Sequence, residues 1–176
     1  MDKKDKKTIE ELSKDDIELY YINSPPKKWT FQPPKIKNMV EAEIEGLVLN
    51  LFAGKTKLDH DGEIIRVDQD EEKDADYNMS ALDFLAQDDR EYDTVVLDPP
   101  YNVRKSREKY EDGYMGNFTR IKNKVKDKIS PSGKVITFGY ATTGMAKTRG
   151  FKKHRAYIIN HKGDHNDTLC IVERKD

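Results

Sequence analysis

Short apolar runs alternate with helix-like segments along most of the chain. Four apolar runs have the length of buried strands, at residues 47–52, 63–68, 93–98 and 134–140. Apolar residues at helical spacing predict three helices, over residues 35–45, 80–87 and 118–129. Strands that alternate with helices usually pair in parallel, so this pattern predicts an α/β domain with a mostly parallel sheet.

The two ends of the chain depart from this alternation. Apolar runs at 151–160 and 167–174 are separated by six residues, too few for a crossover helix, so we predict an antiparallel pair. Near the N-terminus, Thr8 and Glu11 have capping-box spacing, which predicts a short helix over residues 9–22 after a charged, disordered start. We therefore expect an N-terminal extension over 1–34 and a main domain over 35–176.

Composition restricts the class of protein. The 176 residues are 37% charged and 35% hydrophobic, which is typical of one globular domain. No apolar run approaches the roughly 20 residues of a membrane span, and the charged N-terminus does not resemble a secretory signal. We expect a cytoplasmic protein that does not enter a membrane. Cys170 is the only cysteine, which excludes an intrachain disulfide.

Charge is distributed unevenly behind a net charge of -1. Residues 59–93 hold fourteen acidic and three basic residues, whereas residues 102–128 hold nine basic and four acidic ones. Residues 144–162 hold six Lys or Arg and no acid. Such runs are often ordinary solvated faces, but this order also fits one half of the molecule that faces a polyanion.

The segment after the first predicted strand is the first candidate for chemistry. A phosphate-binding loop that ends in Gly54-Lys55-Thr56 would need its first glycine at position 49, and Leu49 occupies it inside the strand. The alternatives are a tight turn, or a loop that lets a nucleotide-like cofactor approach the backbone of Gly54. That second alternative needs an acid after the next strand for a ribose hydroxyl, and Asp68 has this position, with Asp70 close by.

The segment "TVVLDPPYN", residues 94–102, carries the most specific motif. An apolar strand ends in Asp98, two prolines stiffen the exit, and Tyr101 follows. A rigid strand exit is the simple interpretation. The combination with a candidate cofactor loop resembles the S-adenosylmethionine-dependent amino-methyltransferases with a D-P-P-Y motif, which methylate exocyclic amines of nucleic-acid bases. The resemblance covers roughly residues 35–174.

This resemblance implies a fold and a reaction. The fold would be the Rossmann-like class I methyltransferase fold, with a mostly parallel seven-stranded sheet and an antiparallel C-terminal hairpin. Only eight residues, 55–62, separate Gly54 from Glu63, whereas a full crossover needs about ten to twelve or more, so we expect a shortened connection. The cofactor would be S-adenosylmethionine, and no metal would take part.

The resemblance also assigns roles to residues. The cofactor-binding positions would be Asn50, Phe52, Ala53, Gly54, Asp68, Ser80, Ala81 and Asp98. Asn50 and Ser80 stand where the family often has Asp, and Thr56 replaces a second glycine. The catalytic segment would be Asp98, Pro99, Pro100 and Tyr101, in which the Asp98 carboxylate and the Pro99 carbonyl accept the N–H groups of the target amine and Tyr101 stacks on the base. Trp29, Phe31 and Lys35 would close over the methionine end.

The target would be nucleic acid, DNA more than RNA. No part of the sequence resembles a separate target-recognition domain, so recognition falls to residues after the motif or to a protein partner. The candidates that contact phosphates or stack on bases are Asn102, Arg104, Lys105, Arg107, Tyr110 and Tyr140. A solvated loop is the alternative for residues 102–117. The basic segment "KTRGFKKHR", 147–155, would add a second strip of phosphate contacts.

Three functions remain open on the sequence alone. They are a DNA adenine-N6 methyltransferase, an RNA base-amine methyltransferase acting on adenine N6 or guanine N2, and a non-catalytic nucleic-acid-binding subunit. The segment "HKGDHND", 161–167, has metal-ligating residue types, but a polar hairpin turn is the interpretation that we adopt.

Overall fold

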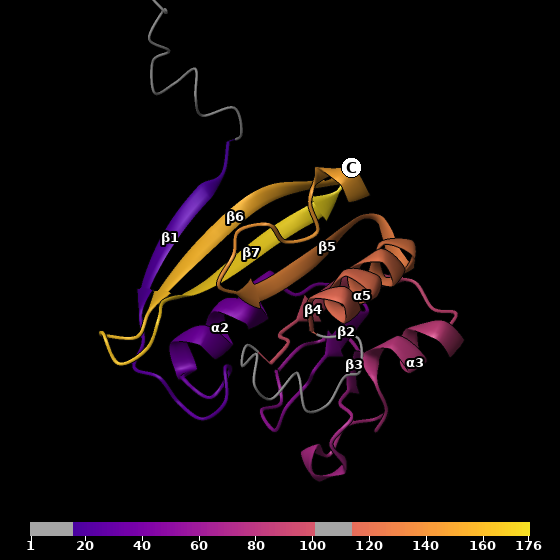
Figure 1. The fold of residues 1–176 in the computed structure, drawn as a ribbon, viewed down its shortest axis with the longest axis horizontal. Coiled ribbons are helices and arrows are strands. Elements are labelled where there is room, and N and C mark those ends of the chain that lie inside the picture. Colours follow the sequence, from indigo (N-terminus) through magenta and orange to yellow (C-terminus); the bar gives the residue numbers. More distant parts are fainter. Residues whose placement is uncertain (1–15, 101–113) are drawn as a thin grey trace, which may run out of the picture.

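One twisted sheet of seven strands crosses the described part of the protein (Figure 1). The computed structural model describes residues 16–100 and 114–176, with side chains from residue 118 in the second range. The strands are β1 (Glu18–Asn23), β2 (Val48–Leu51), β3 (Ile64–Val67), β4 (Tyr92–Leu97), β5 (Ile129–Gly139), β6 (Phe151–Asn160) and β7 (Thr168–Lys175). Their order in the sheet is β1-β6-β7-β5-β4-β2-β3.

Most neighbouring strands run parallel. The pairs β2–β3, β2–β4, β4–β5 and β1–β6 are parallel, whereas β7 is antiparallel to both β5 and β6. The predicted Rossmann-like α/β fold, with a mostly parallel seven-stranded sheet and an antiparallel C-terminal hairpin, is therefore confirmed. The parallel arrangement brings the carboxyl ends of β2, β3, β4 and β5 to one edge of the sheet.

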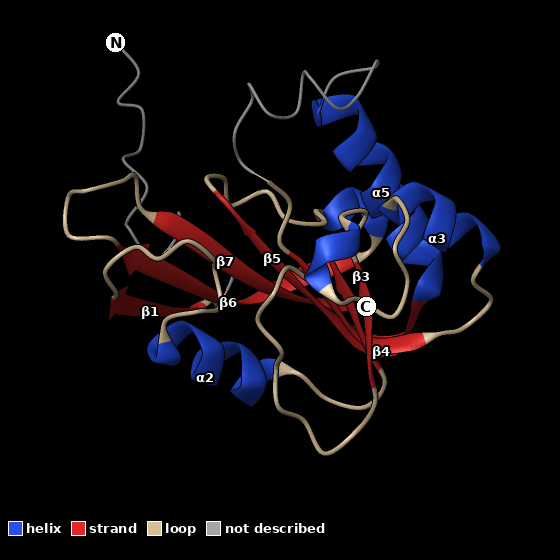
Figure 2. Ribbon diagram, turned by 90° about the horizontal axis from the view of Figure 1, so that it is seen from below, coloured by secondary structure: helices blue, strands red, loops and turns tan. Residues whose placement is uncertain are grey.

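Helices cover the two faces of the sheet in separate layers (Figure 2). Helix α2 (Pro34–Glu43) lies on one face, and α3 (Ala81–Gln87) and α5 (Tyr114–Lys128) lie on the other. Val96 packs in the core under α2, and its neighbours Val95 and Leu97 pack in the core under α3 and α5. Both faces of β4 are thus buried there, which explains the continuous apolar run Val95–Leu97 at its carboxyl end. Two short 3-10 helices, η1 (Glu71–Lys73) and η2 (Lys147–Arg149), lie in connections.

Local signals fix the ends of the helices. Helix α2 begins with Pro34, whose missing N–H costs nothing in the first turn, and it ends where Ile44 adopts extended backbone. The Ser80 hydroxyl accepts a hydrogen bond from the Asp83 backbone N–H at 3.1 Å, which caps α3. Both starts agree with the prediction within one residue.

The connection between β2 and β3 is short, as predicted. Residues 52–63, all of which are described, contain no helix. Leu58 is buried in the core under α2. Asp59 ties the connection to that helix, because its carboxylate pairs with Lys37 at 2.9 Å and its backbone N–H donates to Glu41. Packing against α2 thus replaces the missing crossover helix.

The prediction of a helix over residues 9–22 is wrong for its described part. Glu18–Asn23 forms β1, which pairs in parallel with the edge of β6. Tyr20 stacks on Tyr157 with ring centroids 5.1 Å apart. The run Tyr20–Ile22 is aromatic and β-branched, and such residues favour strands when a sheet edge offers unpaired backbone groups. That edge is more than a hundred residues away in sequence, so local spacing misled the prediction.

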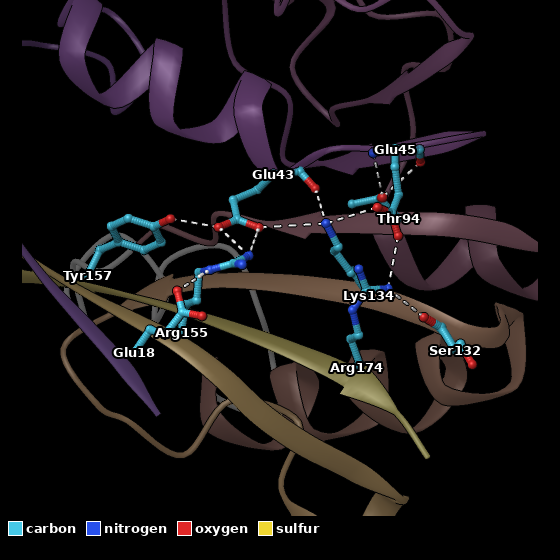
Figure 3. Close-up of polar contacts among 9 residues, drawn as sticks. All are labelled: Glu18, Glu43, Glu45, Thr94, Ser132, Lys134, Arg155, Tyr157 and Arg174. Atoms are coloured by element: carbon cyan, nitrogen blue, oxygen red, sulfur yellow. Dashed lines mark hydrogen bonds and ion pairs between the residues drawn. The ribbon is translucent and has the colours of Figure 1, made fainter. Parts of the chain in front are cut away.

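A buried polar network joins the end of α2 to the sheet (Figure 3). The Glu43 carboxylate accepts hydrogen bonds from the Tyr157 hydroxyl at 2.6 Å and from Arg155 Nη1 at 3.1 and 3.2 Å. Lys134 Nζ lies 3.6 Å from the same carboxylate and 3.0 Å from that of Glu45. Burial and the bond to Glu43 raise the pKa of Tyr157. The network is complete without a ligand, so we assign it a structural role.

Candidate cofactor and substrate site

A cavity of about 380 Å³ lies at the sheet edge where β2, β3 and β4 end. Because parallel strands end on the same side, the segments that follow them meet there, and ligands of open α/β sheets bind at such edges. The cavity is lined by Lys28, Trp29, Thr30, Phe31, Phe52, Ala53, Gly54, Lys55, Thr56, Val67, Asp68, Gln69, Asp70, Lys73, Met79, Ala81, Asp98, Pro99 and Pro100. Predicted cofactor residues and part of the D-P-P-Y motif therefore share one cavity.

The loop after β2 turns sharply toward β3. Phe52 and Gly54 both have positive φ, 64° and 60°. The Ala53 N–H donates to the Val67 carbonyl at 3.0 Å, and Arg66 Nη2 donates to the Gly54 carbonyl at 2.7 Å. A Cβ atom built on Gly54 would meet no other atom within 4 Å. The backbone at Gly54 is therefore held in place and remains open to a ligand.

Asp68 faces this loop from the end of β3. One carboxylate oxygen accepts the Gly54 N–H at 2.9 Å, and the other accepts the Asp70 N–H at 3.0 Å. A carboxylate has about four acceptor positions, so both oxygens can accept a further bond. Asp68 is half-buried and lines the cavity. Asp68 can therefore accept hydroxyl groups of a ligand in the cavity, which is what its predicted role in ribose binding requires.

The exit of β4 forms another wall. Asp98 is half-buried, Pro99 is buried and Pro100 is exposed, and all three line the cavity. The prolines have no N–H and a fixed φ, so the Pro99 carbonyl is held in a defined direction. Tyr101 lies outside the described residues, as do Asn102, Arg104, Lys105, Arg107 and Tyr110.

Two predicted cofactor residues do not line the cavity. Asn50 lies inside β2 between Arg66 and Val96 and is 1% exposed, and its Oδ1 atom is buried without a hydrogen-bond partner. Ser80 caps α3 and its hydroxyl donates to the Asp83 carboxylate at 2.7 Å. Asn50 and Ser80 therefore do not face the cavity. The predicted cofactor residues that line it together are Phe52, Ala53, Gly54, Asp68, Ala81 and Asp98.

The opposite wall comes from the connector before α2. Trp29 and Phe31 line the cavity, whereas Lys35 does not and donates to the Asn23 carbonyl at 3.3 Å. Lys73 was not predicted. Its Nζ atom lies 4.4 Å from the centroid of the Trp29 ring and 3.0 Å from the Asp70 carboxylate. Lys73 is one of three basic residues in the acidic run 59–93, and nothing in the sequence marks it as part of the site, since its partner Trp29 is far away along the chain.

The remaining substrate candidates do not line this cavity. Tyr140 follows the end of β5, is 54% exposed and lines a second cavity of about 200 Å³. The basic segment 147–155 covers η2 and the start of β6, where Phe151 pairs with Lys175 at the opposite edge of the sheet. That segment is therefore distant from the exit of β4.

The segment 161–167 forms the turn between β6 and β7. The two ring nitrogens of His161 are hydrogen-bonded to the Ser24 carbonyl at 3.0 Å and to the Thr168 hydroxyl at 2.9 Å. Within the described ranges, no three His, Cys, Asp or Glu side chains are grouped so that they could hold a metal ion. Nor does the described part of the chain contain a helix with the length and apolarity of a membrane span.

Comparison with solved structures identifies the fold. TrmN from Thermus thermophilus matches with a TM-score of 0.58 and 13% identity over 83% of this chain and 50% of its own. The N-methyltransferase NodS from Bradyrhizobium japonicum matches with a TM-score of 0.53 and 11% identity over 80% of this chain and 93% of its own. Its complex with S-adenosyl-L-homocysteine matches with a TM-score of 0.55 and 9% identity, over 80% and 84%.

The chain has a methyltransferase fold. It spans half of the TrmN structure and nearly all of the first NodS structure. No family model matches the sequence, and no curated protein matches it. At identities of 9–13% the similarity concerns the fold, so activity has to be argued from the site.

Proposed function

We propose that the protein transfers the methyl group of S-adenosylmethionine to an exocyclic amine of a nucleic-acid base, with adenine N6 in DNA as the first candidate. One observation carries this proposal. Asp98, Pro99 and Pro100 line the same cavity as Asp68 and the open backbone of Gly54. A methyl donor held by the loop would thus adjoin the acceptors that an amine requires.

The residues around the cavity fit the cofactor. Asp68 would accept its ribose hydroxyls, and Gly54 would allow it close to the backbone. Phe52, Met79 and Ala81 offer apolar walls for its adenine ring. When bound, S-adenosylmethionine supplies an activated methyl group on a sulfonium centre. The side chains and backbone of the protein would bind the cofactor and orient the amine.

Asp98 and Pro99 would prepare the amine. The lone pair of an exocyclic amine is conjugated with the base and is a poor nucleophile. Acceptors that hold both N–H groups favour a tetrahedral nitrogen whose lone pair points at the methyl group. The Asp98 carboxylate and the Pro99 carbonyl are two such acceptors, and the fixed φ of the prolines limits their motion. The nitrogen that gains the methyl group would lose one proton, which the Asp98 carboxylate would accept and pass to water.

A base amine in RNA is the second candidate substrate. The described residues form one sheet with its helices and contain no separate recognition domain. Folded RNA presents unpaired bases that need no such domain. A DNA substrate would instead call for a protein partner or for recognition by residues after the D-P-P-Y motif.

The decisive experiment is mass spectrometry of nucleosides after incubation with S-adenosylmethionine and total cellular DNA or RNA. We expect N6-methyl-2′-deoxyadenosine from the DNA sample. Asp98→Ala should abolish transfer while S-adenosylhomocysteine still binds in calorimetry, whereas Asp61→Ala, on the exposed β2–β3 connection, should keep both transfer and wild-type binding. Near wild-type turnover of Asp98→Ala would refute the assigned role. Absence of any cofactor binding would leave only a non-catalytic nucleic-acid-binding subunit.

A further inference from the structure

The second cavity adjoins the first. Its volume is about 200 Å³, and it lies between the connector before α2, the exit of β5 and the turn between β6 and β7. Its lining residues are Pro26, Lys27, Lys28, Trp29, Thr30, Pro33, Ile36, Tyr140, Ile159, His161, His165, Asn166 and Thr168. Lys28, Trp29 and Thr30 line both cavities, so one short stretch of chain separates them.

Hydrogen bonds hold the walls of this cavity together. His161 joins the β6–β7 turn to the connector through the Ser24 carbonyl, and the Ser24 N–H donates to the Asn160 carbonyl at 3.0 Å. Ser24 itself is 2% exposed. The connector and the turn are therefore braced against each other, and the cavity between them is part of the fold.

The chemistry of the second cavity differs from that of the first. Trp29 and Tyr140 provide aromatic faces, and Lys27, Lys28 and His165 provide cations or donors. None of its described lining residues is Asp or Glu, whereas the first cavity contains Asp68, Asp70 and Asp98. Aromatic rings that accompany cations favour a ligand with a flat ring and a negative charge, which is the chemistry of a nucleotide.

The second cavity lies near Asp98 and Pro99, the proposed acceptors of the target amine. Tyr140 directly follows β5, which pairs in parallel with β4, and Asp98 directly follows β4. Both residues therefore lie at the same edge of the sheet, on adjacent strand exits. The cavity is smaller than the roughly 300–1,000 Å³ of a drug-sized ligand site, so it suits one unit of a chain.

We propose that the second cavity binds one nucleotide next to the methylated base, in a single-stranded or unpaired segment. Its base would stack on Tyr140 or Trp29, and its phosphate would contact Lys27 and Lys28. This inference rests on the proposed nucleic-acid substrate. It adds a site for a neighbouring nucleotide, on the far side of the Lys28–Thr30 stretch from the cofactor.

Trp29 provides a direct measurement, since it is the only tryptophan of the chain. A single-stranded oligonucleotide should quench its fluorescence, and fluorescence anisotropy of a labelled strand should give the same affinity. Tyr140→Ala and Lys27→Ala should each weaken strand binding, by about tenfold for the tyrosine because a base loses its stacking on an aromatic ring. Lys162→Ala, exposed on the same turn but outside both cavities, is the matched control.

Two results would overturn the proposal. One is wild-type strand affinity in both Tyr140→Ala and Lys27→Ala. The other is adenosine monophosphate that binds as tightly as the strand with the same dependence on both residues, because the cavity would then serve a free nucleotide. The titrations need no methyl transfer, and S-adenosylhomocysteine binding by the variants should stay unchanged. Strand binding that depends on Tyr140 without any methylated product would refute the reaction and retain the nucleotide site.

Discussion

The Gly54 backbone N–H donates a hydrogen bond to the Asp68 carboxylate at 2.9 Å. This bond joins the loop after β2 to the end of β3, and Asp68 also accepts the Asp70 N–H at 3.0 Å. Asp68 therefore braces the loop whether or not it holds a ribose. The two roles can be separated by experiment, because one acts on stability and the other on ligand affinity.

Asp68→Asn should weaken the binding of S-adenosylhomocysteine by about tenfold or more. The amide keeps one acceptor oxygen for the Gly54 N–H but loses the charge, and hydrogen bonds to charged groups are worth about 1.5–3 kcal/mol. Isothermal titration calorimetry measures the affinity, and urea unfolding measures the stability. Asp61→Asn, on the exposed β2–β3 connection, is the control. An unchanged affinity would show that Asp68 is only a brace.

Gly54→Ala and Gly150→Ala form a matched pair. Both glycines have positive φ, 60° and 80°, and a Cβ atom on either would meet nothing within 4 Å. Each substitution should therefore lower the free energy of unfolding by a similar amount, about 1–2 kcal/mol, from backbone strain alone.

Their effects on ligand binding should differ. Gly54 lines the first cavity and Gly150 lies between η2 and β6, outside both cavities. We expect calorimetry to show weaker S-adenosylhomocysteine binding for Gly54→Ala and unchanged binding for Gly150→Ala. Equal affinities in the two variants would place the ligand away from the backbone of Gly54.

Glu43→Gln should destabilise the protein by about 3 kcal/mol. Glu43 is 4% exposed and Lys134 is 5% exposed. The substitution removes the negative charge that faces the cations of Lys134 and Arg155. Removing one partner of a buried ion pair costs about 3–5 kcal/mol, and the lower end applies because Lys134 keeps Glu45 at 3.0 Å. Urea unfolding measures the loss. Glu18→Gln removes an exposed partner of Arg155 and should have only a small effect; equal losses would contradict the argument.

The strands in the middle of the sheet could be predicted because burial on both faces leaves a continuous apolar run. Val95, Val96 and Leu97 pack alternately under α3 and α5 and under α2, and each contributes to the same signal. Leu19 and Tyr21 in β1 are 66% and 61% exposed, so no such run marks that edge strand. Its pairing with β6 is a long-range contact, which local spacing cannot reveal.

The site was predictable only where it follows from strand ends. Gly54, Asp68 and Asp98 each come directly after a strand or within three residues of one, so the sequence predicted their meeting. Lys73 and the wall around Trp29 depend on contacts between distant segments. Asn50 has the sequence position that the motif predicts for a cofactor residue, but it lies within β2 and does not line the cavity. The sequence thus predicted the site residues at the strand ends, but it did not predict the wall that Trp29 and Lys73 form across the cavity.

Glu173 should make stability depend on pH. Its carboxylate accepts the Met145 N–H at 2.5 Å and the Ala146 N–H at 3.2 Å, and it pins the connection between β5 and β6. Burial raises the pKa of Glu173 above its ordinary value of 4.5. The folded state then favours the protonated acid, so this stabilising contribution is complete below pH 4.5 and is lost as pH rises through the raised pKa.

Glu173→Gln removes the titrating group and keeps an acceptor oxygen for one of the two N–H groups. The free energy of unfolding of the variant, minus that of the wild type, should therefore rise with pH from 4.5 upward, until the raised pKa of Glu173 is passed. Urea unfolding at a series of pH values measures this difference. Glu63→Gln, an exposed carboxylate before β3, serves as the control for the loss of one negative charge. A difference that stays constant or falls with pH would contradict the assignment, because the carboxylate of Glu173 would then be at least as well stabilised in the fold as in water.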